Sequence, residues 1–247
     1  MNRTTRPPAY ADGSDFMKNP AIIVMAKVPG FGDVKTRLRP ILSEDQCSSL
    51  ATCFLLDTIA NLEASFDNIL IAFTPEKALS HLKSLIKSEH KLITQKGNDL
   101  GERLKTAIAE AFEMGFAPII VVGTDSPNMP VDLPAKVLAH LSPRENGVVI
   151  GPTEDGGYYL IGVSKQIDDL FNGVTWGANS VFDETISKVN EIGNLDLLIL
   201  PEWFDVDEPD DLLRLNAELC GTVAEANNTV RWLVENQGVF NATSRVT

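Results

Sequence analysis

The sequence predicts an α/β fold with a mainly parallel sheet. Three observations indicate it: short continuous apolar runs, amphipathic segments between them, and unusual loops directly after several of the runs. Continuous apolar runs are typical of strands that are covered on both faces. Strands that alternate with helices indicate a parallel sheet. Ligands of such folds bind at the carboxyl ends of the strands, so the unusual loops are expected to share one edge.

The elements follow in order along the chain. The predicted strands are 21–26, 69–73, 118–122, 148–150, 158–163 and 197–200. The first predicted helix has apolar residues at spacings of three and four from Cys47 to Leu62, and Ser43 with Gln46 forms a capping box at its start. Further helices are predicted at about 100–114, 134–141 and 180–190, and one from near Pro209.

Composition narrows the possible functions. The chain has 247 residues and a net charge of −13, so binding to nucleic acid through phosphates is not expected. Its three cysteines fit no metal or redox spacing, and no apolar run is long enough to span a membrane. Residues 1–19 are polar and lack the apolar core of a signal peptide, so they are predicted to form a flexible tail and the protein is expected to be cytoplasmic.

The first unusual loop is "MAKVPGFGDVKTRLRP", residues 25–40, which follows the first predicted strand. Cations crowd into it although the chain is acidic, and Gly30 and Gly32 allow a close backbone turn. Arg37 could hold an oxyanion by two parallel hydrogen bonds, with Lys35 beside it. These features favour a phosphate-rich ligand. The alternative is a solvated loop with scattered cations.

The second loop is "VVGTDSPNMP", residues 121–130. Asp125 follows a strongly apolar strand, which places its carboxylate at the binding edge. One carboxylate beside a polyphosphate is a common way to hold Mg²⁺. The alternative is an aspartate that only forms a turn.

The third loop, "GPTEDGGYYLIG", spans residues 151–162. Gly156 and Gly157 suggest that a ligand or another backbone comes close. Asp155 could orient an acceptor hydroxyl or help to bind metal. Tyr158 and Tyr159 alternate across a strand, so at most one of them is expected to face the cleft. The alternative is a tight turn with a solvated acid.

The fourth loop is "WFDVDEPDDLLRL", residues 203–215. Asp205 and Asp207 lie two residues apart, so they share a face of an extended segment and either could be a second metal ligand. Asp207 or Glu208, just before Pro209, is equally suited to begin a helix. Both interpretations stay open at this point.

Six motifs together resemble a known bacterial family. They are "AKVPGFGDVKTRL", "GNDLGERL", "GTDSPNMP", "GPTEDGGYYLIG", "FNGVTWG" and "FDVDEPDDL". The chain is similar, over roughly residues 20–216, to the glycosyltransferase-like family DUF2064, of which the guanylyltransferase of coenzyme F420 synthesis is a distant relative. The resemblance implies a three-layer α/β/α fold of the GT-A, or nucleotide-diphospho-sugar transferase, type. After Trp176-Gly177 this chain has Ala178-Asn179, where the family often has Thr and an acid.

The resemblance also implies roles for individual residues. Lys35, Arg37 and Asp155 are the predicted catalytic residues, and Asp125, Asp205 and Asp207 the predicted ligands of Mg²⁺ or Mn²⁺. The predicted nucleotide-binding residues are Ala26, Lys27, Gly30, Gly32, Lys35, Arg37, Gly101 and Arg103. The predicted acceptor-binding residues are Gly156, Gly157, Tyr158 and Trp176.

The expected organisation is a tail at 1–19, a transferase domain at 20–216 and a helical C-terminal extension at 217–247. The preferred activity is nucleotidyl transfer from a nucleoside triphosphate to a small-molecule acceptor, because the cationic loop would stabilise the departing pyrophosphate. One alternative is glycosyl transfer from a nucleotide sugar. The other is a nucleotide-binding regulator without catalysis. The oligomeric state stays open.

Overall fold

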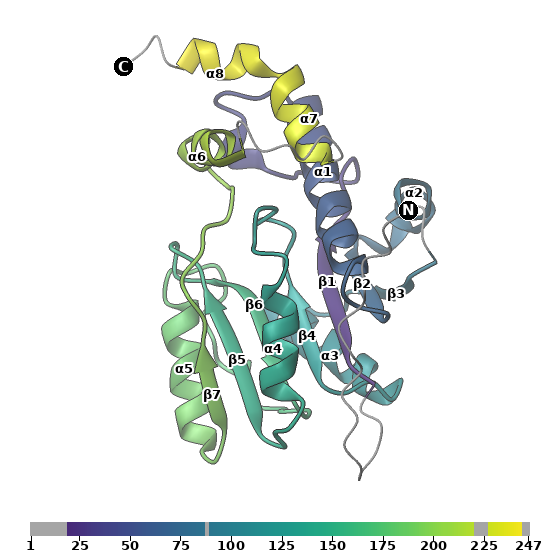
Figure 1. Cartoon of the computed structure of the whole chain (residues 1–247), viewed down its shortest axis with the longest axis vertical. Coiled ribbons are helices and arrows are strands. Elements are labelled where there is room, and N and C mark those ends of the chain that lie inside the picture. Colours follow the sequence, from purple (N-terminus) through teal and green to yellow (C-terminus); the bar gives the residue numbers. More distant parts are fainter. Residues whose placement is uncertain (1–18, 87–88, 220–226, 244–247) are drawn as a thin grey trace, which may run out of the picture.

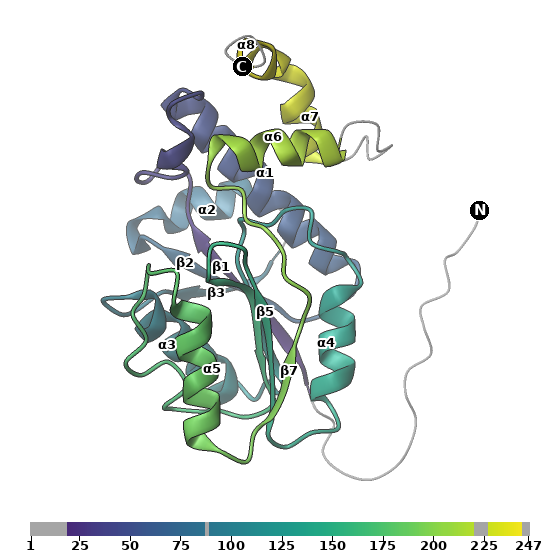
Figure 2. The ribbon, with the colours of Figure 1, turned by 90° about the vertical axis from the view of Figure 1, so that its left-hand side faces the viewer.

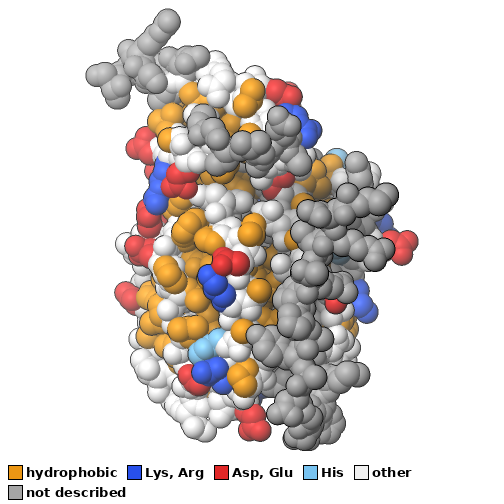
Figure 3. Space-filling view, in the orientation of Figure 1, with side chains coloured by type: hydrophobic (Ala, Val, Ile, Leu, Met, Phe, Trp, Pro, Cys, Tyr) orange, Lys and Arg blue, Asp and Glu red, His pale blue; other side chains and the backbone are white. Residues whose placement is uncertain are grey.

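The structure is a computed structural model that describes residues 19–86, 89–219 and 227–243 (Figure 1). The predicted tail therefore lies outside the described residues, apart from Asn19. In this part of the chain, no helix is both long and apolar enough to cross a membrane. Figure 3 shows acidic side chains along the margins of one face, in keeping with the net charge of −13.

Seven strands of the described chain form one sheet in the order β3-β2-β1-β4-β6-β5-β7. They are β1 Ala21–Lys27, β2 Ile69–Thr74, β3 Lys91–Thr94, β4 Ile119–Val122, β5 Gly147–Pro152, β6 Tyr158–Val163 and β7 Asp196–Ile199. Four neighbouring pairs are parallel, and the two pairs that contain β6 are antiparallel. The prediction of a mainly parallel sheet is confirmed.

The reversed direction of β6 has a local cause. Only residues 153–157 join β5 to β6, and a parallel pair would need a crossover of a dozen or more residues. Gly156 turns this connection with a φ of +87°. As a result, the start of β6 at Tyr158 lies at the same edge of the sheet as the carboxyl ends of the parallel strands.

Six helices belong to the body of the fold: α1 Glu44–Glu63, α2 Leu79–Leu85, α3 Leu100–Glu113, α4 Leu133–Leu141, α5 Val181–Ile192 and α6 Pro209–Leu219. The predicted capping box at the start of α1 is confirmed. The hydroxyl of Ser43 accepts from the Gln46 backbone N–H at 3.2 Å, and the Gln46 side chain accepts from the Ser43 N–H at 2.9 Å.

Sequence reasoning missed β3 and α2. Both are short, and each buries few side chains: Ile93 is the buried residue of β3, and Leu82 that of α2. An edge strand has one neighbour and needs no continuous apolar run, so the pattern that identified the other strands is absent here.

Helices cover both faces of the sheet (Figures 1 and 2). Successive side chains of a strand point to opposite faces. Ile22 and Val24 of β1 therefore pack in the cluster that contains Leu55 of α1, together with α2 and α4. Ile23 packs on the other side with Leu104 of α3, in the cluster that also includes α5. The predicted three-layer arrangement is confirmed.

A third apolar cluster lies beyond the sheet. It joins α6 and two further helices, α7 Asn228–Glu235 and α8 Gln237–Thr243, to the N-terminal half of α1 (Figure 1). Its buried members include Leu38, Phe54, Val206, Leu215, Trp232 and Leu233. The helix α6 continues past residue 216 to Leu219, so the boundary placed there by sequence falls inside a helix.

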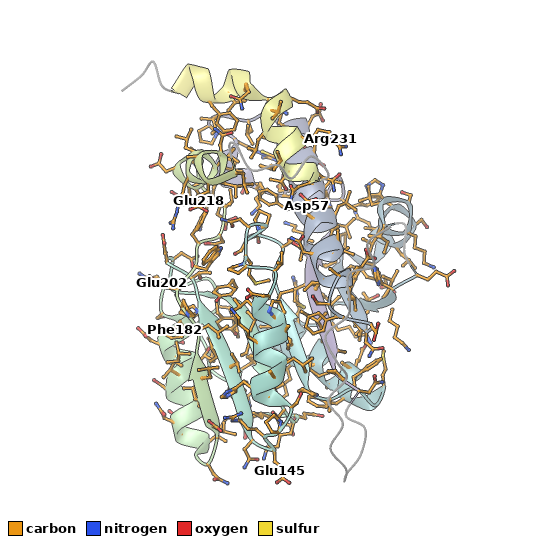
Figure 4. The ribbon with its side chains drawn as sticks, viewed as in Figure 1. Asp57, Glu145, Phe182, Glu202, Glu218 and Arg231 are labelled. Carbon is orange, nitrogen blue, oxygen red and sulfur yellow. The ribbon has the colours of Figure 1, made fainter. Side chains whose placement is uncertain are left out.

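A buried aspartate fixes the C-terminal helices to α1. Figure 4 shows Asp57 on α1 beneath α7. Its carboxylate accepts hydrogen bonds from the backbone N–H groups and side chains of Asn228 and Thr229, at distances from 2.6 to 2.9 Å. These groups lie at the start of α7, where a helix has unpaired donors and favours negative charge.

Candidate functional site

A cleft of about 840 Å³ opens along the carboxyl edge of the sheet. The segments that follow β1, β3, β4 and β5 line it, as do the start of β6 and residues 176–179. Asp205 and Asp207, in the segment that precedes α6, complete the wall. All four loops selected from the sequence thus meet at one edge, where α/β folds bind their ligands.

Most of the predicted site residues line this cleft: Lys27, Lys35, Arg37, Arg103, Asp125, Asp155, Gly157, Tyr158, Trp176, Asp205 and Asp207. Five do not: Ala26, Gly30, Gly32, Gly101 and Gly156. Ala26 is only 1% exposed because it points into the core from β1. Gly30 and Gly32, with φ of +79° and +149°, shape the loop backbone.

The other two glycines make room for protein rather than ligand. A Cβ on Gly101 would lie 2.2 Å from the indole nitrogen of Trp176. A Cβ on Gly156 would lie 1.9 Å from the carbonyl oxygen of Asn179. Each of these glycines lets two protein segments approach closely, and their roles as nucleotide and acceptor contacts stay predictions.

Lys35 lies deep in the wall of the cleft. Its side chain is 4% exposed. The ammonium forms an ion pair with Asp125 and a second with Asp207 at 2.9 Å, and it donates to the carbonyl oxygen of Val206 at 2.8 Å. Burial lowers the pKa of Lys35, but the two carboxylates outweigh it and raise the pKa above its usual value. The expected phosphate contact is here an ion pair with two aspartates.

Arg37 has the opposite character. Its side chain is 65% exposed, and the nearest carboxylate oxygen, on Glu208, lies 3.9 Å away. Because an exposed pair at that distance is weak, the guanidinium is available to a ligand. Two further cations border the same part of the cleft. Lys27 donates to the backbone of Asp33, and Arg103 donates through Nε to the Gly97 carbonyl at 3.1 Å.

Four aspartates also line the cleft, Asp125, Asp155, Asp205 and Asp207. Asp155 accepts from the Thr153 hydroxyl at 2.6 Å and from the Gly157 N–H at 3.0 Å, which stabilises the turn between β5 and β6. Burial, followed by the carboxylates of Asp155, Asp207 and Asp125, raises the pKa of Asp205 to about 7. This part of the cleft therefore carries more negative charge than its cations balance.

The start of α6 separates the two interpretations of Asp207. The carboxylate of Asp211 accepts from the backbone N–H groups of Asp207 and Glu208, at 3.1 and 2.7 Å. The Asp207 carboxylate instead pairs with Lys35. Asp211 is thus the residue that caps the helix, and the side chain of Asp207 faces the site.

The donor chemistry of this acidic group suits a hard divalent cation. Mg²⁺ and Mn²⁺ prefer carboxylate oxygens, and three further carboxylates lie close enough to Asp205 to add to the effect of burial on its pKa. Within the described ranges, no group of three or more His, Cys, Asp or Glu side chains is arranged to hold an ion. Asp125 and Asp207 are both engaged by Lys35.

Aromatic side chains form the wall beyond Asp155. Tyr158 meets Trp176 edge to face, with ring centroids 6.2 Å apart. The Tyr158 hydroxyl is buried, and burial raises its pKa more than the nearby Thr185 side chain lowers it. Tyr159 also lines the cleft, and its hydroxyl donates to the Pro201 carbonyl at 3.1 Å. Tyr158 and Tyr159 pack in the clusters on opposite faces of the sheet, as the alternation along a strand predicts.

Sequence reasoning missed Gln95. Its amide nitrogen donates to the carbonyl oxygens of Ala72 at 2.7 Å and Ala26 at 3.3 Å, which fixes the side chain where it borders the cleft. Gln95 directly follows β3, so recognition of that strand would have drawn attention to it.

The α/β fold, with its mainly parallel seven-stranded sheet, resembles that of the nucleotide-diphospho-sugar transferases and of nucleotidyltransferases with the same architecture. The chain belongs to the DUF2064 family, described as conserved in bacteria, whose profile matches residues 58–178. A crystal structure from Desulfovibrio desulfuricans G20, provisionally described as a nucleotide-diphospho-sugar transferase, is 32% identical. The match covers 92% of this chain and 98% of that one, with a TM-score of 0.84.

More distant relatives extend the comparison. The 2-phospho-L-lactate guanylyltransferase of Methanosphaera stadtmanae is 24% identical over 199 residues, which cover 77% of this chain and 82% of that protein. Molybdopterin-guanine dinucleotide biosynthesis protein A from Archaeoglobus fulgidus is 16% identical, with a TM-score of 0.54. That match covers 82% of this chain and 100% of the other, and it shows a shared fold.

Proposed function

We propose that this protein is a metal-dependent nucleotidyltransferase that uses a nucleoside triphosphate and a small-molecule acceptor. The observation that carries the proposal is that one cleft holds both an exposed guanidinium, on Arg37, and a group of four aspartates. Triphosphate and metal together need both kinds of group. The relationship to a guanylyltransferase supports the same reaction class.

In the proposed step, an acceptor oxygen attacks the α-phosphorus of the triphosphate. A new oxygen–phosphorus bond forms, the bond from the α-phosphorus to the bridging oxygen of the β-phosphate breaks, and pyrophosphate leaves. Arg37, with Lys27 and Arg103, stabilises the charge of the departing phosphates. If the acceptor group is a hydroxyl, Asp155 orients it and receives its proton. Tyr158 and Trp176 contact the body of the acceptor.

Asp125, Asp205 and Asp207 are the residues that would hold Mg²⁺ or Mn²⁺. Such an ion, when bound, neutralises phosphate charge and makes the phosphorus more open to attack. The contribution of the chain is to supply hard oxygen ligands at the edge where the phosphates lie.

A second candidate is glycosyl transfer from a nucleotide sugar. The description of the 32% identical relative as a nucleotide-diphospho-sugar transferase favours it. In that reaction a nucleoside diphosphate leaves, and a metal held by the same aspartates would offset its charge. The third possibility, a regulator that binds nucleotide without turnover, uses the same cleft.

The test screens nucleoside triphosphates and nucleotide sugars by thermal shift, with and without Mg²⁺. A ligand at about 100 times its dissociation constant adds roughly 2.7 kcal/mol to stability. The nucleotides that bind are then incubated with candidate acceptors, and pyrophosphate and nucleoside diphosphate are measured separately. Pyrophosphate release that depends on acceptor supports nucleotidyl transfer. Nucleoside diphosphate release from a nucleotide sugar supports glycosyl transfer, and metal-dependent binding without either product supports a regulator.

A further inference from the structure

The ammonium of Lys35 lies where two of the proposed metal ligands meet. An ammonium donates three hydrogen bonds and accepts none. All three donors are engaged, by Asp125, by Asp207 and by the carbonyl oxygen of Val206. No donor of Lys35 is left for a phosphate in this arrangement, although its place in the loop had suggested that role.

The backbone around Lys35 holds the side chain in this position. Lys35 has a φ of +49°, in the left-handed region that a non-glycine residue rarely adopts. Its carbonyl oxygen accepts from the thiol of Cys47 at 3.4 Å. Leu38 is fully buried in the third apolar cluster and anchors the loop three residues later. The Lys35 Nζ also lies 5.3 Å from the centre of the Phe54 ring. Contacts at both ends therefore orient the side chain.

We infer that Lys35 is a positioning residue that acts as the internal counter-ion of the acidic group: its ammonium lies between Asp125 and Asp207 and excludes a divalent cation from them until it is displaced. The inference rests on the proposed function, because it takes these aspartates as metal ligands. An ammonium and a divalent ion repel each other strongly at a few ångströms. Each carboxylate oxygen that pairs with Lys35 is also withdrawn from coordination.

The rival role is the one that the sequence suggests, in which Lys35 binds phosphate. The two roles differ in what they predict for metal alone. A phosphate ligand has no effect on metal affinity when nucleotide is absent. A competing counter-ion lowers that affinity, so its removal strengthens metal binding.

The experiment measures binding of Mn²⁺ alone to the full chain, without nucleotide, by titration calorimetry and by electron paramagnetic resonance. Lys35→Met is expected to bind Mn²⁺ at least about tenfold more tightly than the wild type, on the order of the effect of one nearby like charge. Lys35→Arg keeps the charge and should stay near the wild-type affinity. Lys27→Met removes a cation from the same cleft that does not pair with Asp125 or Asp207, and should change the affinity little.

Thermal unfolding gives a second readout that does not depend on activity. Lys35→Met leaves two carboxylates without their counter-ion, so its Tm in EDTA should fall. Mn²⁺ should then raise the Tm of Lys35→Met by more than it raises that of the wild type. If the variant is unfolded in EDTA, recovery of its folded state in Mn²⁺ supports the same inference.

Unchanged or weaker Mn²⁺ binding by Lys35→Met, with no larger gain in Tm, would overturn the inference. The double variant Lys35→Met/Asp125→Asn identifies the site, because it should lose the gain in affinity. If the double variant still binds Mn²⁺ more tightly than the wild type, that result also counts against the inference. Failure of the proposed function is distinguishable, since it would appear as a lack of transfer with every nucleotide whatever the Mn²⁺ affinities are.

Discussion

Burial and nearby carboxylates act together on Asp205. It is partly buried, and three other carboxylates lie near enough to raise its pKa to about 7. An ordinary aspartate in an unfolded chain ionises near pH 3.9. Because the folded state holds the proton more tightly, ionisation of Asp205 opposes folding. That cost is absent below about pH 4, grows as the pH rises to about 7, and is fully present above it.

Asp205→Asn should therefore stabilise the metal-free protein. We expect its Tm in EDTA to exceed that of the wild type at pH 8, with little difference at pH 4, because only the charged form is unfavourable. Differential scanning calorimetry at the two pH values measures this. Glu145→Gln, at an exposed residue at the other end of the sheet (Figure 4), is the matched control. Equal Tm values for Asp205→Asn and wild type at pH 8 would contradict the charge surplus.

Arg37 is expected to act in catalysis and not in folding. Its side chain is 65% exposed, so Arg37→Ala should leave the Tm unchanged. If the guanidinium stabilises a transferring or leaving phosphate, Arg37→Ala should lower kcat by about a hundredfold, the usual effect of losing one such contact. Arg37→Lys keeps the charge but loses the two parallel hydrogen bonds of a planar guanidinium. Its kcat should therefore lie between that of the wild type and that of Arg37→Ala. A rise in KM with unchanged kcat would instead mean that Arg37 only binds the ground state.

At the level of elements, the packing of α3 against the segment after Phe171 shapes one wall of the cleft. Trp176 lies over Gly101 in the first turn of α3 and contacts Phe171 and Tyr158 on its other sides. The motifs "GNDLGERL" and "FNGVTWG" are far apart in the chain, yet they form one structural unit here. A helix can approach an indole this closely only where it has no side chain.

Gly101→Ala should consequently disturb the wall. Alanine normally stabilises a helix by up to about 1 kcal/mol relative to glycine, but here its Cβ would overlap the Trp176 ring. We expect a lower Tm and a shifted tryptophan emission spectrum. Gly238→Ala in α8, where a Cβ meets nothing within 4 Å, is the control and should not lower the Tm. Identical emission spectra for wild type and Gly101→Ala would rule out this packing.

Across the whole molecule, the third apolar cluster connects the C-terminal helices to the edge of the sheet that carries the cleft. Trp232 and Leu233 of α7 belong to the same cluster as Leu38, which follows Lys35 and Arg37 in their loop. Val206, which stands between Asp205 and Asp207 in the sequence, belongs to the same cluster. Support for both charged segments therefore includes helices of the C-terminal extension that the sequence predicts beyond residue 216.

Trp232→Ala tests this connection. Trp232 is 5% exposed, and its indole donates to the Ser49 hydroxyl at 2.8 Å. Truncation of a buried tryptophan costs about 3–5 kcal/mol, and here it should also weaken nucleotide binding because the loop at Leu38 loses support. Urea unfolding and nucleotide titration measure the two effects. Val234→Ala on the same helix, at a side chain 63% exposed, should change neither. Loss of stability with full nucleotide affinity would separate the cluster from the site.

Much of the fold follows from local patterns in the sequence. The apolar runs mark six of the seven strands of the described chain, and the spacing of apolar residues in 47–62 marks α1. A strand that is buried on both faces gives a continuous apolar run, whereas a helix that is buried on one face gives apolar residues at every third or fourth position. The sequence also predicts that the four charged loops lie at one edge of the sheet, because the carboxyl ends of parallel strands meet there. The short edge strand β3 leaves no such pattern, and Gln95 was missed with it.

The partners of individual side chains depend on the tertiary structure. Lys35 pairs with Asp207 across 172 residues of sequence, and Asp211 rather than Asp207 caps α6. Composition and spacing could show that these residues are charged and lie near one edge. They could not show which charge meets which, because this depends on strand order, on the reversed β6 and on helices that bury the loop from beyond the sheet. A difference of a few ångströms decides whether Lys35 binds a phosphate or two carboxylates, and only the packed structure sets that distance.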